Sequence, residues 1–199
     1  IVTPSITADI SCNGDADGKL TATTTGGNGG ITWTWNNETP TATNTNLATG
    51  AYVILVEDAK GCKDTAEIYL PEPDVLVDVV TITDLNCFED ASGKINAVAS
   101  GGSPIFPNFQ YDYTFYEVIN GSNVQVDNQQ QSTATSTGLS EGTYIVIVED
   151  AHGCKDTSNA YYIVQPDNPL SINVDSTDET CTDKGTATAY VSGGTQPYS

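Results

Sequence analysis

The sequence contains one segment twice, and this duplication limits what the chain can fold into. Residues 50–65 read GAYVILVEDAKGCKDT, and residues 142–157 read GTYIVIVEDAHGCKDT. Such a close duplication inside one chain is typical of a repeat protein, so the fold question becomes a question about one repeat. In both copies, alternating apolar residues lead into a turn sequence that contains Gly. The segment therefore predicts a strand, a tight turn and the start of a returning strand.

The spacing of strands and turns predicts small all-β domains in series. The 199 residues show no sustained apolar spacing of i, i+3, i+4 and i+7, which argues against amphipathic helices. Alignment of the copies predicts a first repeat at residues 1–72, a second at residues 73–166, and the N-terminal part of a third, truncated repeat at residues 167–199. The Pro-containing spacer at residues 71–74 is stiff, so we expect the repeats to form an extended rod. No apolar run reaches the length of a membrane span and no leader is present, so we expect a piece of a longer protein without membrane insertion.

Aromatic residues occupy positions that are typical of a β-sandwich. The pattern Leu-x-x-Gly-x-Tyr, which ends in Tyr52 and again in Tyr144, is that of a tyrosine corner, in which the phenol bonds to upstream backbone. Trp33 and Trp35 alternate along a predicted strand at residues 31–35 and fit the core of a sandwich. The alternative is that both tryptophans form a platform on which a sugar ring stacks.

The second repeat is longer than the first in one place. The segment between its Gly-Gly pair and the Leu of its tyrosine corner spans 37 residues against 20 in the first repeat, so 17 residues are inserted. The insertion contains Asn120-Gly121 between alternating apolar runs, a strong hairpin signal because both residues tolerate positive φ. We therefore predict an extended hairpin at the edge of the sandwich. The polar residues 128–137 that follow show no pattern, and we expect them to be mobile.

The chain is strongly acidic. It has 26 Asp and Glu residues against 6 Lys and Arg residues, a formal net charge of −20. Such a surface repels nucleic-acid phosphates and anionic lipids, which excludes both as partners. The charge keeps a crowded protein soluble, and the alternative is that the carboxylates capture cations.

Four carboxylates are candidates for a calcium site. The turn at residues 13–18 resembles the first half of an EF-hand loop, but the twelfth position, which needs a bidentate carboxylate, is Thr24. An EF-hand is therefore excluded, and a plain turn is the main interpretation. The alternative is a different calcium site built from Asp15, Asp17, Asp58 and Asp64. No other cofactor is expected.

Catalysis has no support in the sequence. No set of Ser, His and Asp recurs, and the lone His152 is replaced by Lys60 in the first copy. The consecutive carboxylates Glu57 and Asp58 lie on one predicted strand and face opposite sides, which is wrong for an acid and base pair. We therefore expect no enzyme activity.

The five cysteines indicate disulfides rather than a metal site. No Cys-x-x-Cys is present, so a zinc site lacks both ligand number and spacing. We predict pairing within repeats, Cys12 with Cys62 and Cys87 with Cys154, which leaves Cys181 unpaired. The alternative pairs Cys62 with Cys87 and Cys154 with Cys181. Geometry opposes this alternative, because a proline spacer carries the chain along a rod whereas bonded Cα atoms lie within about 7 Å.

Several motifs recur at fixed places in the repeats. They are Cys12-Asn-Gly-x-x-x-Gly18, Gly26-Gly27, Trp35, Leu47-x-x-Gly50-x-Tyr52, Val56-x-Asp58-x-x-Gly61-Cys62 and Gly193-Gly194-Thr-Gln-Pro-Tyr198. In this combination the chain resembles the SprB-type repeat of giant cell-surface adhesins in gliding Bacteroidetes. The resemblance covers nearly the whole chain, and the second copy departs from it by its insertion. Asp64-Thr65-Ala66 also looks like an O-glycosylation site of Bacteroidetes surface proteins.

The resemblance implies a fold, a location and a role. It implies tandem immunoglobulin-like β-sandwiches in a non-catalytic segment of a very large adhesin, exported by type IX secretion and displayed at the cell surface, with outer-membrane attachment through other parts of the protein. The implied partners are neighbouring repeats, an external surface or polysaccharide, and the secretion and gliding machinery of the cell envelope. The implied role is an extended stalk and attachment in gliding motility. The alternative is a carbohydrate-binding or spacer module of a secreted polysaccharide-degrading enzyme.

Overall fold

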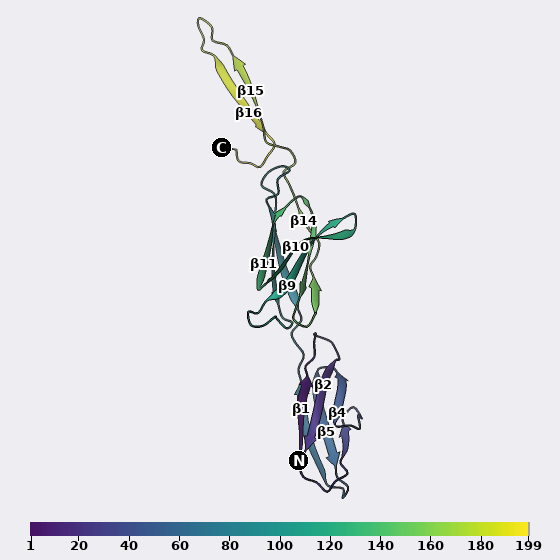
Figure 1. Cartoon of the computed structure of the whole chain (residues 1–199). Helices are drawn as coiled ribbons and strands as arrows, with labels where there is room; N and C mark the ends of the chain where they lie inside the picture. Colours follow the sequence, from purple (N-terminus) through teal and green to yellow (C-terminus); the bar gives the residue numbers. More distant parts are fainter. Residues whose placement is uncertain (199) are drawn as a thin grey trace. The chain divides into compact units, whose positions relative to one another are not determined.

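The computed structural model describes residues 1–198, and the regular secondary structure of these residues is entirely β (Figure 1). The prediction of an all-β chain is confirmed. Two compact units emerge from the contacts. The first unit consists of Ile1–Val77, Ser100–Pro107 and Glu149–Lys155, and the second unit takes the other described residues. The predicted repeat boundaries stay predictions, because this division follows contacts rather than the duplication.

The first unit contains a sandwich of two three-stranded antiparallel sheets. One sheet has the order β1-β2-β4, with β1 at Val2–Ala8, β2 at Gly18–Thr24 and β4 at Thr43–Leu47. The other has the order β3-β5-β6, with β3 at Thr32–Trp35, β5 at Gly50–Glu57 and β6 at Lys63–Leu70. The duplicated segment of the sequence thus forms β5, the turn after it and the start of β6.

The core of this sandwich comes from the inner faces of both sheets. Leu20 and Ala22 of β2 are buried, and Ile54 of β5 and Leu70 of β6 are fully buried opposite them. Because side chains alternate along a strand, each strand gives one face to this core and one to solvent. Complete burial of one Leu or Ile side chain contributes about 1.5–3 kcal/mol.

A second sandwich repeats this plan with more strands. One sheet has the order β11-β8-β7, with β7 at Val77–Thr83, β8 at Gly93–Ser100 and β11 at Thr133–Leu139. The other has the order β10-β9-β12-β13, and β14 also pairs with β12. Its strands are β9 at Tyr111–Ile119, β10 at Ser122–Gln131, β12 at Gly142–Glu149, β13 at Lys155–Thr157 and β14 at Tyr161–Ile163.

The inserted residues of the second copy form the β9–β10 hairpin, as predicted. Asn120 and Gly121 make its turn with φ angles of 51° and 77°. Two positive φ values in succession are what a tight hairpin turn of matching twist requires, and Asn-Gly adopts them with little strain. The register continues from Ser122 paired with Ile119 to Gln131 paired with Tyr111.

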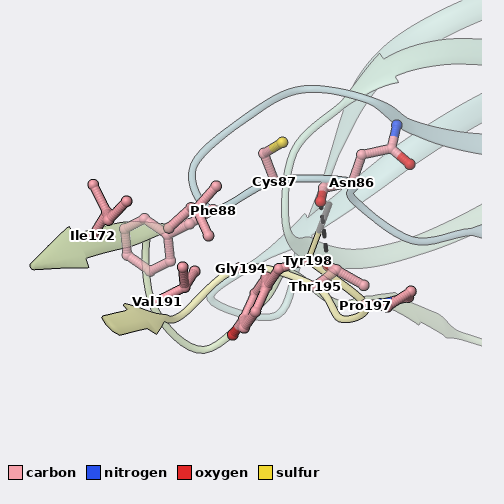
Figure 2. Close-up of a pocket in the computed structure, with 10 residues that line it drawn as sticks. Asn86, Cys87, Phe88, Ile172, Val191, Gly194, Thr195, Pro197 and Tyr198 are labelled. Atoms are coloured by element: carbon pink, nitrogen blue, oxygen red, sulfur yellow. Dashed lines mark hydrogen bonds between the residues drawn. The ribbon is translucent and has the colours of Figure 1, made fainter. Parts of the chain in front are cut away.

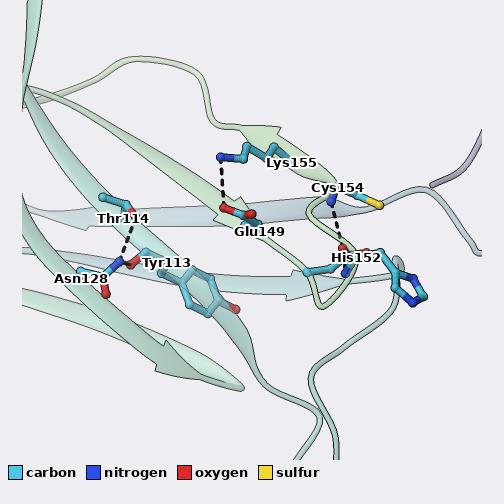
Figure 3. Close-up of polar contacts among 8 residues, drawn as sticks. Tyr113, Thr114, Asn128, Glu149, His152, Cys154 and Lys155 are labelled. Atoms are coloured by element: carbon cyan, nitrogen blue, oxygen red, sulfur yellow. Dashed lines mark hydrogen bonds and ion pairs between the residues drawn. The ribbon is translucent and has the colours of Figure 1, made fainter. Parts of the chain in front are cut away.

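The prediction that residues 128–137 are mobile is wrong. They form the end of β10 and most of β11. The Asn128 side chain donates to Tyr113 O (3.2 Å) and to Thr114 Oγ1 (3.0 Å), and Figure 3 shows the Asn128–Thr114 bond. The end of β10 is mostly exposed, whereas β11 buries Ala134 and Ser136 at alternate positions. Small or polar residues at buried positions give no apolar alternation in the sequence, and the backbone ladder supplies the pairing.

The last strands, β15 at Ser171–Thr177 and β16 at Thr186–Ser192, form a two-stranded hairpin whose residues are all exposed. Its Ile172 and Val191 are at the positions equivalent to Val2 of the first copy and Ala99 of the second, and both of those residues are buried in their sandwiches. The hairpin therefore carries apolar residues at positions that face a core in the sandwiches, but among the described residues no second sheet covers them. Within the part of the chain that the structure describes, no helix is long and apolar enough to span a membrane.

Candidate functional site at the cysteine turns

The turn after β5 is built around the carboxylate of Asp58. Its Oδ1 accepts hydrogen bonds from the backbone N–H groups of Lys60 (2.8 Å) and Cys62 (3.0 Å). Its Oδ2 accepts from the backbone N–H and the side-chain amide of Asn28, at 3.0 and 2.9 Å. These donors, the Asn28 amide first, hold the pKa of Asp58 well below its usual value although the residue is buried. The charged Asp58 thereby fixes Cys62 and the Gly-Gly segment before Asn28 in one geometry.

The turn after β12 has the same construction. Oδ1 of Asp150 accepts from the backbone N–H groups of His152 (2.9 Å) and Cys154 (3.0 Å), and its Oδ2 accepts from Ser103 N (2.7 Å). A side chain at Gly102 would place its Cβ only 2.6 Å from Asp150 Oδ2, so this close approach requires glycine. Figure 3 shows Cys154 on this turn, beside an ion pair of 3.1 Å between Lys155 and Glu149.

A different loop, between β1 and β2, presents Cys12. Asp15 N donates to Cys12 O (3.0 Å), which closes the turn that the sequence predicts at residues 13–18. Ser11 donates to Asp17 through its N–H (3.1 Å) and its hydroxyl, and these bonds lower the pKa of Asp17. Gly14 N donates to Glu72 Oε2 (2.8 Å). The loop is therefore anchored to the end of the first sandwich.

Cys12 and Cys154 form a disulfide within the first unit. Their sulfurs are 2.07 Å apart and their Cα atoms 5.7 Å apart, across a sequence separation of 142 residues. Cys62, Cys87 and Cys181 are free and exposed. The predicted pairs Cys12–Cys62 and Cys87–Cys154 are therefore wrong, and the alternative pairs Cys62–Cys87 and Cys154–Cys181 are not formed either. Of the prediction, only the unpaired state of Cys181 agrees with the structure.

Strand direction explains why pairing within a repeat fails. Strands β2 and β5 begin at the same end of the sandwich, because Gly18 at the start of β2 lies against Leu70, which pairs with Gly50 at the start of β5. Cys12 precedes β2 and Cys62 follows β5, so one strand length separates them. The 8 residues of β5 span about 26 Å, far beyond the limit of about 7 Å for bonded Cα atoms. The second copy has the same strand directions.

The four candidate calcium ligands do not form one site. Asp15 and Asp17 lie in the loop before β2, whereas Asp58 and Asp64 lie at the opposite end of the sandwich, by the strand directions above. Asp64 Oδ2 accepts from Val2 N (2.7 Å), which lowers its pKa, and both oxygens of Asp58 already accept from N–H groups. Among the described residues, no group of three or more His, Cys, Asp or Glu is placed to hold a metal ion.

Trp33, Trp35, Tyr52 and Tyr144 all take part in the packing or the hydrogen bonding of the sandwiches. Trp35 is 1% exposed and its indole N–H donates to Thr41 O (3.0 Å), while Trp33 is half-buried against the same core. Trp35 therefore has no free face on which a sugar ring could stack. The phenols of Tyr52 and Tyr144 donate to the backbone oxygens four residues upstream, at 2.9 and 3.0 Å, as a tyrosine corner requires.

Comparison with known proteins identifies the repeat. The family model described as SprB repeat matches residues 5–40 and 79–114. Two segments of this chain therefore match the SprB repeat. The two matched SprB segments cover the same part of each sandwich, since they begin within β1 and β7, and each includes the cysteine before the second strand. SprB repeats form a non-catalytic family and indicate a cell-surface, adhesin-like repeat segment.

Other comparisons add little to the SprB match. No curated protein matches this chain. Among solved structures, the three N-terminal domains of the bacteriophage RB49 Highly Immunogenic Outer Capsid protein (Hoc) are similar over 98% of this chain and 69% of that chain, with 16% identity and a TM-score of 0.46.

Proposed function

We propose that this chain is a non-catalytic segment of a very large secreted adhesin, in which the repeats serve as an extended stalk and in attachment during gliding motility. The observation that carries the proposal is the disulfide between the first and second copies of the repeat. A bond between copies joins consecutive repeats covalently, whereas a bond within one copy would not. The SprB match supplies the cell-surface setting.

Three further properties support this role. A disulfide suits the oxidising exterior of a cell. The net charge of −20 keeps densely displayed copies from associating with one another. The two Asp turns have the same construction, in which the carboxylates bond to backbone N–H groups and hold the turns in place, as a structural repeat requires. The external surface or polysaccharide that the adhesin grips, and the type IX secretion and gliding machinery that handles it, are partners in this proposal.

The proposal is tested on the cells that produce the protein. An antibody raised against this chain should label intact cells, and an in-frame deletion of residues 1–166 from the gene should reduce attachment to glass and gliding speed. A deletion strain that still displays the rest of the protein controls for failed export. Normal attachment and gliding by such a strain would contradict the proposed role.

The alternative, a carbohydrate-binding or spacer module of a secreted polysaccharide-degrading enzyme, predicts different behaviour. It requires retention of the purified chain on a polysaccharide matrix, with loss of retention when the half-buried Trp33 is replaced. We favour the adhesin because Trp35, the other half of the suggested platform, is 1% exposed and hydrogen-bonded.

A further inference from the structure

The cysteines fall into two classes by their place in the repeat. Loop cysteines precede the turn before the second strand of a copy, and they are Cys12, Cys87 and Cys181. Turn cysteines end the sequence Asp-x-x-x-Cys, with Gly before the Cys, and they are Cys62 and Cys154. The disulfide of the first unit joins one member of each class, and it joins the loop cysteine of one copy to the turn cysteine of the next.

The free loop cysteine Cys87 is held in the same way as Cys12. Asp90 N approaches Cys87 O at 3.5 Å, as Asp15 N approaches Cys12 O at 3.0 Å. Glu89 N donates to Gln165 Oε1 (2.8 Å), which repeats the bond from the equivalent backbone N–H in the first unit to Glu72. The Cys87 loop therefore has the same supporting hydrogen bonds as the loop in which Cys12 forms its disulfide.

A hollow of about 530 Å³ lies beside Cys87 within the second unit. Figure 2 shows Cys87 and Phe88 on one side of it and the segment from Gly194 to Tyr198 on the other. The Thr195 hydroxyl donates to Asn86 O (3.3 Å), which holds this segment to the loop.

Comparison with the first unit indicates what this hollow fits. There, the Asp150 turn contacts two other parts of the chain. Its cysteine, Cys154, is bonded to the loop cysteine Cys12. Its carboxylate accepts from the N–H of Ser103 (2.7 Å), the residue that follows a Gly-Gly pair. In the second unit, Cys87 and Thr195, which follows Gly193-Gly194, lie together at the hollow. The third part of the arrangement is an Asp turn, and residues 167–199 contain none that ends in Gly-Cys.

We propose that the hollow beside Cys87 receives the Asp-x-x-Gly-Cys turn of another copy of this repeat and that its cysteine forms a disulfide with Cys87. The Asp carboxylate of the incoming turn accepts the Thr195 N–H, as Asp150 accepts Ser103 N. Two thiols lose two protons and two electrons in this step. A small-molecule disulfide such as oxidised glutathione takes them up and leaves as two thiols. The repeats are thus cross-linked in series, each loop cysteine to a turn cysteine of the following copy.

The inference rests on the Cys12–Cys154 bond and the duplicated loop, and it holds whether or not the protein acts in gliding. The probe is a synthetic peptide with the sequence of residues 142–157, its cysteine activated as a mixed disulfide with thiopyridine. The 199-residue chain is treated with less than one equivalent of this peptide, and mass spectrometry of the digest shows which thiol has reacted. Cys62 and Cys181, both free and exposed, are internal controls.

We expect Cys87 to react about ten times faster than either control, which corresponds to about 1.4 kcal/mol of binding by the turn. A scrambled peptide should lose this preference, and a peptide in which the Asp of the turn is replaced by Asn should reduce it. A Cys87→Ser chain should show only the slow reaction of Cys62 and Cys181. Equal labelling of the three thiols, or the same preference with the scrambled peptide, would overturn the proposal.

Discussion

Asp78 is a misplaced charge in the second sandwich, and replacing it should stabilise the protein. Its backbone N–H donates to Asp156 Oδ2 (3.0 Å), while its own Oδ2 is buried without a hydrogen-bond partner. In the first sandwich the same place is taken by Val2, whose N–H donates to Asp64 Oδ2 (2.7 Å) and whose side chain is 5% exposed. Burial first, and then the charge of Asp156, raise the pKa of Asp78 from 3.8 to about 6.

The sign and size of the effect follow from this pKa. Between pH 4 and pH 6 the folded chain holds a proton on Asp78 that the unfolded chain has released, so stability is highest below this window and is lost as the pH rises through it. A difference of about two pH units corresponds to about 3 kcal/mol, and screening of the partly exposed side chain reduces it to about 1–2 kcal/mol. Asp78→Val keeps the backbone bond to Asp156 and removes the charge. It should raise the free energy of unfolding of the second unit by about 1–2 kcal/mol at pH 7 and by clearly less at pH 4.

The assay must report the two units separately. Both tryptophans, Trp33 and Trp35, lie in the first unit, so their fluorescence in urea follows that unit, and hydrogen exchange of the β7 and β12 amides follows the second. Val2→Asp is the matched control, because it places a carboxylate beside Asp64 and should destabilise the first unit more at pH 7 than at pH 4. An equal gain from Asp78→Val at both pH values, or no gain, would refute the reasoning.

Three further predictions follow from the core, the corners and the turns. Trp35→Ala should lower the free energy of unfolding of the first unit by about 3–5 kcal/mol in urea titrations, and Trp33→Ala by clearly less, because Trp33 is only half-buried. Tyr52→Phe and Tyr144→Phe should each cost about 1 kcal/mol by loss of the corner bond, with the larger loss at the more buried Tyr144. Millimolar calcium should leave the melting temperature unchanged, because the Asp58 oxygens are already bonded to N–H groups; a clear rise would show a calcium site.

The parts of the fold that the sequence predicted are those with local signals. Apolar alternation in the duplicated segment predicted β5 and β12. Asn120-Gly121 predicted a hairpin, because a turn that needs two positive φ values leaves few residue choices. The tyrosine corners were visible because their bond spans only four residues. Residues 128–137 were not predicted as strands because the buried positions of β11 hold the small Ala134 and the polar Ser136, which show no apolar alternation.

The disulfide was not predictable from cysteine spacing, because it depends on which ends of the strands meet. The expectation of an extended rod favoured pairing within repeats, whereas the common direction of β2 and β5 places Cys12 and Cys62 at opposite ends. Counting strands would not have excluded the pair, because β3 is antiparallel to β5 and β4 is antiparallel to β2, so these two consecutive strands run in the same direction. The role of Asp58 was also hidden, because an Asp after a strand looks like an ordinary turn residue until the N–H groups around it are placed.

The Cys12–Cys154 bond also changes how the chain would respond to a pull on its two ends. The bond closes a covalent ring, so tension entering at residue 1 crosses from Cys12 directly to Cys154 and continues toward residue 199. Everything between these cysteines, from β2 to β12, lies off the path of the load. The sequence separation of 142 corresponds to about 480 Å of contour length, at about 3.4 Å per residue, and none of it can be released while the sulfurs stay joined. Under oxidising conditions the chain should behave as a short, stiff tether, and under reducing conditions as a long, extensible one.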